Sequence, residues 1–219
     1  MGKQGGVLNA RYIAVEGVIG AGKTSLAKIL QRHFGGQLVM EQHEENPFLP
    51  DFYRDPQRYG FQTQIFFLLS RWKQQQELTQ LNLFHDRIVS DYLFAKDKIF
   101  ASMNLQEREL ELYEKLLEAV ESSIVKPDLV IYLQASVQRL LYNIKLRGRS
   151  YEKEMSEEYI RGLSDAYNHY FSHYHDSPLL VINATKLDFV GDIGQQEAML
   201  AFIAESKHTG TRFYPKPEE

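Results

Sequence analysis

The chain has 219 residues, 43% of them hydrophobic, and its 25 basic and 29 acidic side chains give a net charge of −4. This length fits one α/β domain, and the weak negative charge excludes a surface devoted to holding a nucleic-acid polymer. The absence of cysteine excludes a disulfide scaffold and thiol catalysis, and the longest apolar run, Ile65 to Leu69, is far below the roughly 20 residues that cross a bilayer. We therefore expect a cytoplasmic protein without a membrane partner.

Short aliphatic runs alternate with helical patterns. The runs predict five strands, at Tyr12 to Val15, Leu38 to Met40, Ile88 to Ser90, Leu129 to Leu133 and Leu179 to Ile182. The patterns predict helices at Lys23 to His33, Pro56 to Leu81, Phe94 to Ser123, Val137 to Leu146, Glu157 to His173 and Gln195 to Ser206. Strands that are continuously apolar are typical of a parallel sheet covered on both faces. We expect the domain to span residues 1–208 and residues 209–219 to form a flexible tail.

A phosphate-binding loop follows the first predicted strand. Residues Gly17 to Thr24 match the pattern G-x-x-x-x-G-K-[ST] between a strand and a helix. Glycines let successive N–H groups converge on phosphate oxygens, Lys23 supplies charge to the outer phosphates, and the Thr24 hydroxyl can bind Mg²⁺. We predict binding of ATP or GTP by Gly17, Gly20, Ala21, Gly22, Lys23, Thr24 and Ser25.

A motif near the end of the chain matches the one with which P-loop GTPases bind guanine. Residues 185–188, Thr-Lys-Leu-Asp, match [NT]-K-x-D, but a GTPase also needs D-x-x-G after a strand. No aspartate between Ile88 and Leu133 is followed by glycine at that spacing. The sequence therefore favours a kinase over a GTPase.

A kinase needs a base near the acceptor, a metal ligand and positive charge over the transferred group. Glu41, after the second strand, is the candidate base, and Asp91, after the third, is a candidate Mg²⁺ ligand with Thr24. Arg147 and Arg149 flank a glycine in a predicted lid of about residues 147–153. From the residues alone, an exposed loop carboxylate at Glu41 and a basic helix cap at Arg147 remain open alternatives.

The long second helix carries a polar stripe. Gln64 and Arg71 are seven residues apart and share one face, with Phe67 between them able to wall a flat ring. Asp97, on a later helix, can face the same cavity and pair with Arg71. The open alternative is that Arg71 faces solvent at the helix end.

Together these motifs resemble the deoxynucleoside kinase family, most closely its bacterial deoxyguanosine/deoxyadenosine kinase branch. The resemblance covers roughly Tyr12 to Ile203; beyond the phosphate loop it is carried by residues 45–49, residues 52–56 with Phe61 and Gln64, residues 90–92 with 99–101, and residues 146–149. It implies an α/β P-loop kinase fold with an arginine lid. It also implies ATP- and Mg²⁺-dependent phosphorylation of the 5′-hydroxyl of a purine deoxynucleoside in salvage, by a homodimer.

The resemblance also implies individual roles. Glu41 resembles the base for the 5′-hydroxyl, the pair Tyr53 and Glu152 resembles the group that holds the sugar 3′-hydroxyl, and Gln64 resembles the residue that bonds the nucleobase. Asp188 and Phe189 resemble the loop on the donor adenine. Substrate contacts are expected from Glu41, Tyr53, Gln64, Phe67, Arg71, Asp97, Phe100 and Glu152.

Two positions depart from the family pattern. The family's Glu-Arg-Ser is Asp-Tyr-Leu at residues 91–93, so an arginine is missing, and Lys96 is a candidate replacement. Asn143 stands where a further lid arginine is usual, which predicts a less positive lid and less efficient transfer.

Two alternatives remain. A nucleoside monophosphate kinase shares the loop, lid and sheet, but its acceptor phosphate would be repelled by a carboxylate at Glu41. A non-catalytic nucleotide-binding subunit of the same fold has no need of Lys23, Thr24, Glu41 and Asp91 together.

Overall fold

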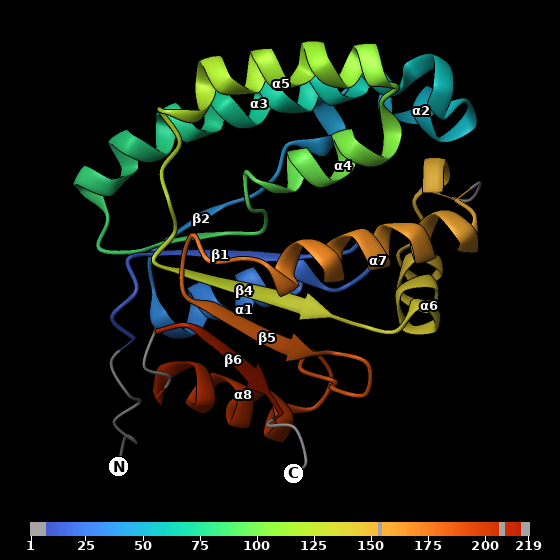
Figure 1. Ribbon diagram of the computed structural model, residues 1–219. Coiled ribbons are helices and arrows are strands. Elements are labelled where there is room, and N and C mark those ends of the chain that lie inside the picture. The colour runs from blue at the N-terminus through green and yellow to red at the C-terminus, as the bar shows by residue number, and fades with distance from the viewer. Residues whose placement is uncertain (1–7, 153–154, 206–208, 216–219) are drawn as a thin grey trace, which may run out of the picture.

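The protein is a parallel α/β sheet covered by helices, seen here in a computed structural model that describes residues 8–152, 155–205 and 209–215 (Figure 1). The sheet has six strands in the order β2-β3-β1-β4-β5-β6, and every pairing is parallel. The strands are β1 Tyr12–Gly17, β2 Gln37–Val39, β3 Ile88–Ser90, β4 Leu129–Gln134, β5 Leu179–Asn183 and β6 Thr211–Tyr214. The predicted α/β class is confirmed.

Eight α-helices and two short 3₁₀ helices connect these strands within the described residues. They are α1 Lys23–Phe34, η1 His43–Glu45, α2 Leu49–Arg54, α3 Pro56–Phe84, α4 Lys96–Asn104, α5 Glu107–Glu121, α6 Val137–Arg147, η2 Ser150–Glu152, α7 Glu157–Ser172 and α8 Ile193–Glu205. Figure 1 shows α3 and α5 running side by side as an outer layer above α4, and α8 at the opposite end of the molecule. No helix in the described part of the chain is both long and apolar enough to cross a membrane.

The central strands form because their apolar residues are buried on both faces of the sheet. All six residues of β1 are buried, as are the first five of β4. Continuous burial explains why these strands read as uninterrupted apolar runs. The predicted strands therefore appear in the structure, with shifts of one or two residues at their ends.

Two predictions of the fold are wrong. The sheet has six strands rather than five, because Thr211–Tyr214, within the predicted flexible tail, pairs with β5 as the edge strand β6. The single helix predicted over Phe94 to Ser123 is two helices, α4 and α5. The chain is extended at Leu105, and Gln106 and Glu109 then form a reciprocal capping box that begins α5.

The strand order brings distant segments to one edge of the sheet. The strands β2, β3 and β1 are neighbours and point the same way. Glu41 follows β2, Asp91 follows β3, and the phosphate loop follows β1. These segments therefore meet at the carboxyl edge of the sheet, where ligands bind in open α/β folds.

Candidate active site

The phosphate loop is shaped by glycines and closed by its lysine. Gly20 and Gly22 have φ of 86° and 98°, in the left-handed region that favours glycine. The Lys23 ammonium donates to the carbonyl oxygens of Gly17 at 2.7 Å and Val18 at 3.2 Å. Burial, followed by the nearby charge of Lys96, lowers the pKa of Lys23 to about 8. The left-handed glycines and the Lys23 ammonium thus lie together at the N-terminus of α1, where helices favour phosphate binding.

Asp91 links the phosphate loop to the segment after β2. Its carboxylate accepts from the Thr24 hydroxyl at 2.5 Å and from the backbone N–H of Glu41 at 2.8 Å. The described residues contain no group of three or more His, Cys, Asp or Glu side chains that could hold a metal. A hydroxyl and a carboxylate nevertheless suit Mg²⁺, which usually keeps several waters and substrate phosphates as its other ligands. The predicted pair Thr24 and Asp91 is therefore brought together as Mg²⁺ binding requires.

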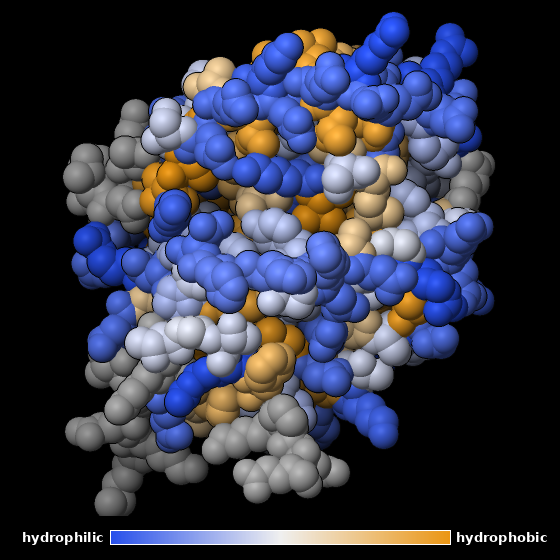
Figure 2. Space-filling model, viewed as in Figure 1, coloured by the Kyte–Doolittle hydropathy of each residue, from blue (hydrophilic) through white to orange (hydrophobic). Residues whose placement is uncertain are grey.

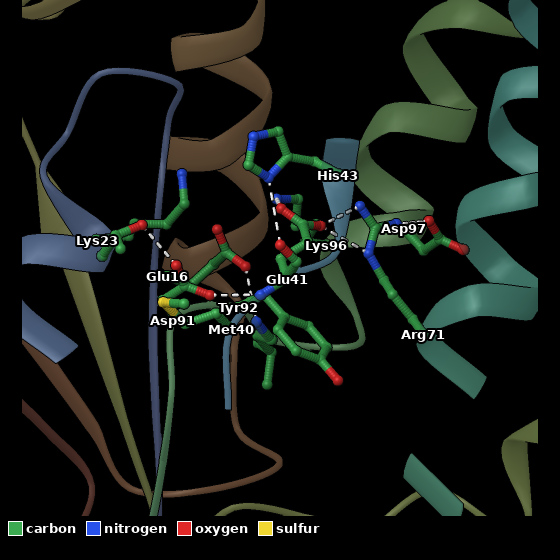
Figure 3. Close-up of polar contacts among 12 residues, drawn as sticks. Glu16, Lys23, Met40, Glu41, His43, Arg71, Asp91, Tyr92, Lys96 and Asp97 are labelled. Atoms are coloured by element: carbon green, nitrogen blue, oxygen red, sulfur yellow. Dashed lines mark hydrogen bonds and ion pairs between the residues drawn. The ribbon is translucent and has the colours of Figure 1, made fainter. Parts of the chain in front are cut away.

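Glu41 is held by two cations (Figure 3). One carboxylate oxygen, Oε2, accepts from the Lys96 ammonium at 2.8 Å. The other, Oε1, accepts from Arg71 Nε at 2.9 Å and Nη2 at 2.5 Å. Burial raises the pKa of Glu41, but the charges of Lys96 and Arg71 outweigh it and hold this pKa well below its usual range. The predicted base is therefore an ionised carboxylate inside the site and not an exposed loop residue.

Arg71 joins this cluster to the acceptor side. Its Nη1 also forms an ion pair with Asp97, and its guanidinium lies 4.6 Å from the centre of the Phe67 ring. The Arg71 side chain is only 3% exposed, so the alternative that it faces solvent is wrong. Gln64 is buried on the same helix, and its Oε1 has no hydrogen-bond partner among the described residues. An unpaired buried acceptor of this kind is satisfied by a ligand or by water.

One cleft unites the two sides of the site. It reaches from the phosphate loop, over Glu41, to the α3 stripe and the 147–152 segment. It contains most of the predicted side chains: Lys23, Thr24, Glu41, Tyr53, Gln64, Phe67, Arg71, Asp91, Phe100, Arg147, Arg149 and Glu152. Asp97 is fully buried behind Arg71 and acts on the cleft only through it. The cleft can thus hold a triphosphate at one end and an aromatic acceptor at the other.

The predicted lid arginines are held by a buried carboxylate. Arg147 donates to Glu152 from Nε at 3.1 Å and from Nη2 at 2.5 Å, and an Arg149 nitrogen lies 3.5 Å from the same carboxylate. The neighbouring Tyr151 ring stacks on Tyr53, with ring centres 6.0 Å apart. Residue 153 of the predicted lid lies outside the described residues. The Nη1 group of Arg147 has no hydrogen bond to this carboxylate, and the Arg147 side chain is 36% exposed in the cleft.

We expect Arg147→Ala and Arg149→Ala each to lower kcat by about 10-fold or more while changing the KM for the nucleoside little. These charges meet the phosphoryl group most strongly as it moves, so their loss raises the transition state more than the bound state. Steady-state kinetics with varied nucleoside measures the split. A change in nucleoside KM alone would instead identify the arginines as helix caps.

Asn143 does not occupy the lid. Its side-chain amide, on α6, donates to the Gly20 carbonyl oxygen at 2.8 Å and so braces the phosphate loop. A Cβ on Gly20 would lie 2.6 Å from the Leu140 carbonyl oxygen of the same helix, which shows how closely loop and helix pack. The position that departs from the family pattern thus has a contact of its own.

We expect Asn143→Ala to raise the KM for ATP about threefold to tenfold, the effect of one lost hydrogen bond, with a smaller change in nucleoside KM. Asn143→Arg should give no gain in turnover, because the short amide that donates to the Gly20 carbonyl oxygen is lost. Leu146→Ala, on the exposed face of the same helix, is the matched control. A rise in kcat for Asn143→Arg would show that lid charge matters more than the brace.

The loop residues Gly17, Gly20, Ala21, Gly22 and Ser25 do not line the cleft themselves, and two further predicted donor-site residues, Asp188 and Phe189, also lie outside it. Phe189 is buried, and its ring would be 3.0 Å from a Cβ on Gly22, so it packs beneath the phosphate loop. The Asp188 carboxylate accepts from the backbone N–H of Val190 at 3.3 Å and of Gly191 at 2.8 Å. Both therefore shape the loop next to the P-loop, and their contact with ATP stays a prediction.

Several residues of the cleft were missed by the sequence. His43 lies in it, near Glu41, whose carbonyl oxygen is 3.2 Å from His43 Nδ1. The other additions are Ile19, Leu49, Phe52, Thr63, Lys96 (which the sequence offered only as a replacement charge) and Tyr151. For His43, the one signal in the sequence was its position two residues after Glu41. The apolar residues that line the cleft have no distinctive spacing and so gave no signal.

Comparison with known proteins agrees with this geometry. A deoxynucleoside kinase family model matches residues 13–206. Deoxyguanosine kinase of Bacillus subtilis is 33% identical over 201 residues, covering 90% of this chain and 97% of that protein. Deoxyadenosine kinase of Lactobacillus acidophilus is 36% identical over 209 residues, covering 89% and 95%. The structure of deoxyadenosine kinase from M. mycoides with bound dATP superposes with a TM-score of 0.76 at 29% identity, covering 87% and 97%.

Proposed function

Because the chain belongs to the deoxynucleoside kinase family, we propose that it transfers a phosphoryl group from ATP to the 5′-hydroxyl of a purine deoxynucleoside. Deoxyguanosine, deoxyadenosine or both are the acceptors, and the reaction serves nucleotide salvage. One observation carries this proposal: a single cleft contains the P-loop lysine, an ionised glutamate and an unpaired amide on an aromatic-lined wall.

At the donor end, the loop N–H groups and Lys23 bind the outer phosphates of ATP. Thr24 and Asp91 would hold Mg²⁺, which supplies charge neutralisation between the phosphates when bound. Arg147 and Arg149 leave Glu152 and neutralise charge on the transferred group. The Arg147–Glu152 pair thus opens as the lid engages.

At the acceptor end, Glu41 accepts the proton of the 5′-hydroxyl as the new O–P bond forms and the bond to ADP breaks. A carboxylate of low basicity suits this step, because a loose transition state develops little charge on the attacking oxygen until late. Tyr53 and Glu152 border the cleft where they can hold the 3′-hydroxyl. The sugar is thereby fixed at both ends.

The nucleobase meets Gln64, Arg71 and, behind it, Asp97. Guanine O6 can accept from Arg71 while its N1–H donates to the unpaired Gln64 oxygen, and adenine can pair with the Gln64 amide. Thymine would place its methyl group against the polar side chains of Gln64 and Arg71, and sites built for hydrogen bonds reject such analogues strongly. Deoxycytidine is the competing acceptor, because cytosine also offers a donor and an acceptor and lacks the methyl group of thymine.

A nucleoside monophosphate kinase is the second candidate, and the position of Glu41 disfavours it. A carboxylate facing the acceptor repels a second phosphate. The intact set of Lys23, Thr24, Glu41 and Asp91 likewise disfavours a non-catalytic subunit.

The test is formation of ADP by the wild-type protein with ATP and Mg²⁺ against a panel of the four deoxynucleosides and their monophosphates. We expect turnover with deoxyguanosine or deoxyadenosine and little with thymidine. Turnover only with monophosphates would identify the second candidate, and no turnover with any acceptor would identify a non-catalytic subunit. A preference for deoxycytidine would overturn the purine assignment alone.

We further propose that the protein is a homodimer that uses the outer helical layer. Leu69 on α3 and Leu112 and Leu116 on α5 are 50%, 48% and 39% exposed. Figure 2 shows hydrophobic residues between hydrophilic ones over this upper layer. Sedimentation velocity of the wild type and of Leu112→Glu tests it: a dimer that dissociates on substitution supports the proposal, and a wild-type monomer contradicts it.

A further inference from the structure

Lys96 occupies a position that stability does not favour. It is the first residue of α4, where the helix dipole opposes positive charge, and its side chain is only 7% exposed. Burying an ammonium is costly unless it is paired. In the described part of the chain its one ion pair is with Glu41, at 2.8 Å. The ion pair with Glu41 therefore accounts for a buried lysine at this position.

The two cations on Glu41 differ in their other partners. Arg71 is shared with Asp97 and lies against Phe67, on the wall of the cleft that faces the acceptor. Lys96 has Phe100 beside it, 5.6 Å from the ring centre, and forms no ion pair with a second carboxylate among the described residues. A ligand that bonds to Arg71 can draw it away from Glu41, whereas no second carboxylate among the described residues competes with Glu41 for Lys96.

The two cations also bind different oxygens of Glu41. Arg71 occupies Oε1 through Nε and Nη2, and Lys96 occupies Oε2. Departure of Arg71 alone would leave Oε1 unoccupied and Oε2 anchored. An anchored carboxylate with one available oxygen is the arrangement that a base for a hydroxyl proton needs.

We propose that Lys96 is the positioning residue of Glu41: it holds Oε2 throughout the reaction while the nucleobase draws Arg71 off Oε1, which then accepts the 5′-hydroxyl proton. This inference rests on the proposed function. The 5′ oxygen forms its bond to the γ-phosphorus, the bond from that phosphorus to the bridging oxygen breaks, and ADP leaves with the electron pair. The proton stays on Glu41 Oε1 until it is released to water.

The experiment compares kcat and both KM values for the wild type, Lys96→Met, Lys96→Arg, Glu41→Gln and the double variant Lys96→Met with Glu41→Gln. The matched control is Lys98→Met, on the same helix, because Lys98 is 47% exposed and pairs only with the exposed Glu121 in the recorded contacts. Thermal melting and ATP binding show that each variant is folded, and Lys96→Gln replaces Lys96→Met if that protein does not fold.

We expect Lys96→Met to lower kcat about 10-fold or more, with the nucleoside KM changed less than about threefold, and Lys96→Arg to recover most of the loss. In the Glu41→Gln background the same substitution should lower kcat less than about twofold, because a residue acting through Glu41 has nothing left to position. Lys98→Met should match the wild type.

Three results would overturn the proposal. Equal losses with and without Glu41 would mean that Lys96 acts on the phosphates directly. A loss confined to KM would mean that it serves binding, and no recovery by arginine would mean that a positive charge at this position does not by itself hold Glu41. Failure of the proposed function is read separately, from a wild-type protein that folds and binds ATP but phosphorylates no deoxynucleoside.

Discussion

Lys23→Ala is expected to abolish phosphoryl transfer, with a loss of roughly 10³-fold or more in kcat. The ammonium lies in the cleft at the phosphate loop, where the transferred group gains negative character as it leaves ADP. Water cannot replace this charge in a closed site. Coupled measurement of ADP formation checks the loss, and Lys28→Ala, exposed on the same helix, is the control. Normal turnover by Lys23→Ala would contradict the kinase assignment.

The same lysine predicts a pH dependence of ATP binding. Burial and the charge of Lys96 lower the pKa of Lys23 to about 8, so the unliganded protein loses this proton as the pH rises above that value. A neutral lysine attracts phosphates less, and ATP affinity should fall at higher pH. Calorimetric titration should show this fall in the wild type and not in Lys23→Ala.

Glu41→Gln is expected to lower kcat by about 10²- to 10⁴-fold, the usual contribution of a positioned general base. Glutamine keeps the shape of the side chain but cannot accept the hydroxyl proton as a carboxylate does. The loss should lie toward the lower end, because the charge of Lys96, which stays beside Glu41 when Arg71 leaves, lowers the pKa of Glu41 and makes it a weaker base. Glu44→Gln, three residues further along in the 3₁₀ helix η1 and with a side chain 78% exposed, is the control.

Glu41→Gln should also destabilise the protein. It leaves the buried Arg71 and Lys96 with Asp97 as their only neighbouring carboxylate in the recorded ion pairs, and breaking a buried pair usually costs about 3–5 kcal/mol. Thermal melting measures this loss, so kinetics should be read below the variant's melting temperature. Turnover equal to that of the wild type would show that another group is the base.

Most of the secondary structure could be predicted from local patterns in the sequence. The apolar strands and the P-loop can each be recognised from a short stretch of sequence. Burial on both faces of the sheet requires consecutive apolar residues, and close contact with phosphate requires glycines and a lysine at fixed spacing. The edge strand β6 has no such signal, since its residues are largely exposed and only pairing with β5 makes them a strand. The break between α4 and α5 was hidden because Ala101, Leu105 and Leu110, before, at and after it, all face one apolar cluster.

The sequence by itself determined the phosphate loop, the α/β class and the residue types that a kinase needs, since each depends on contacts between near neighbours. The tertiary structure decided how the remaining residues combine. Glu41 follows β2, Arg71 lies in α3, and Lys96 begins α4, so their meeting depends on strand order and helix packing. The same packing places Asn143, at a position where the family pattern has a lid arginine, so that its amide donates to the Gly20 carbonyl oxygen. Ion pairs over 30 and 55 residues of separation leave no local pattern, because the physical distance between their members is set only when the whole sheet has formed.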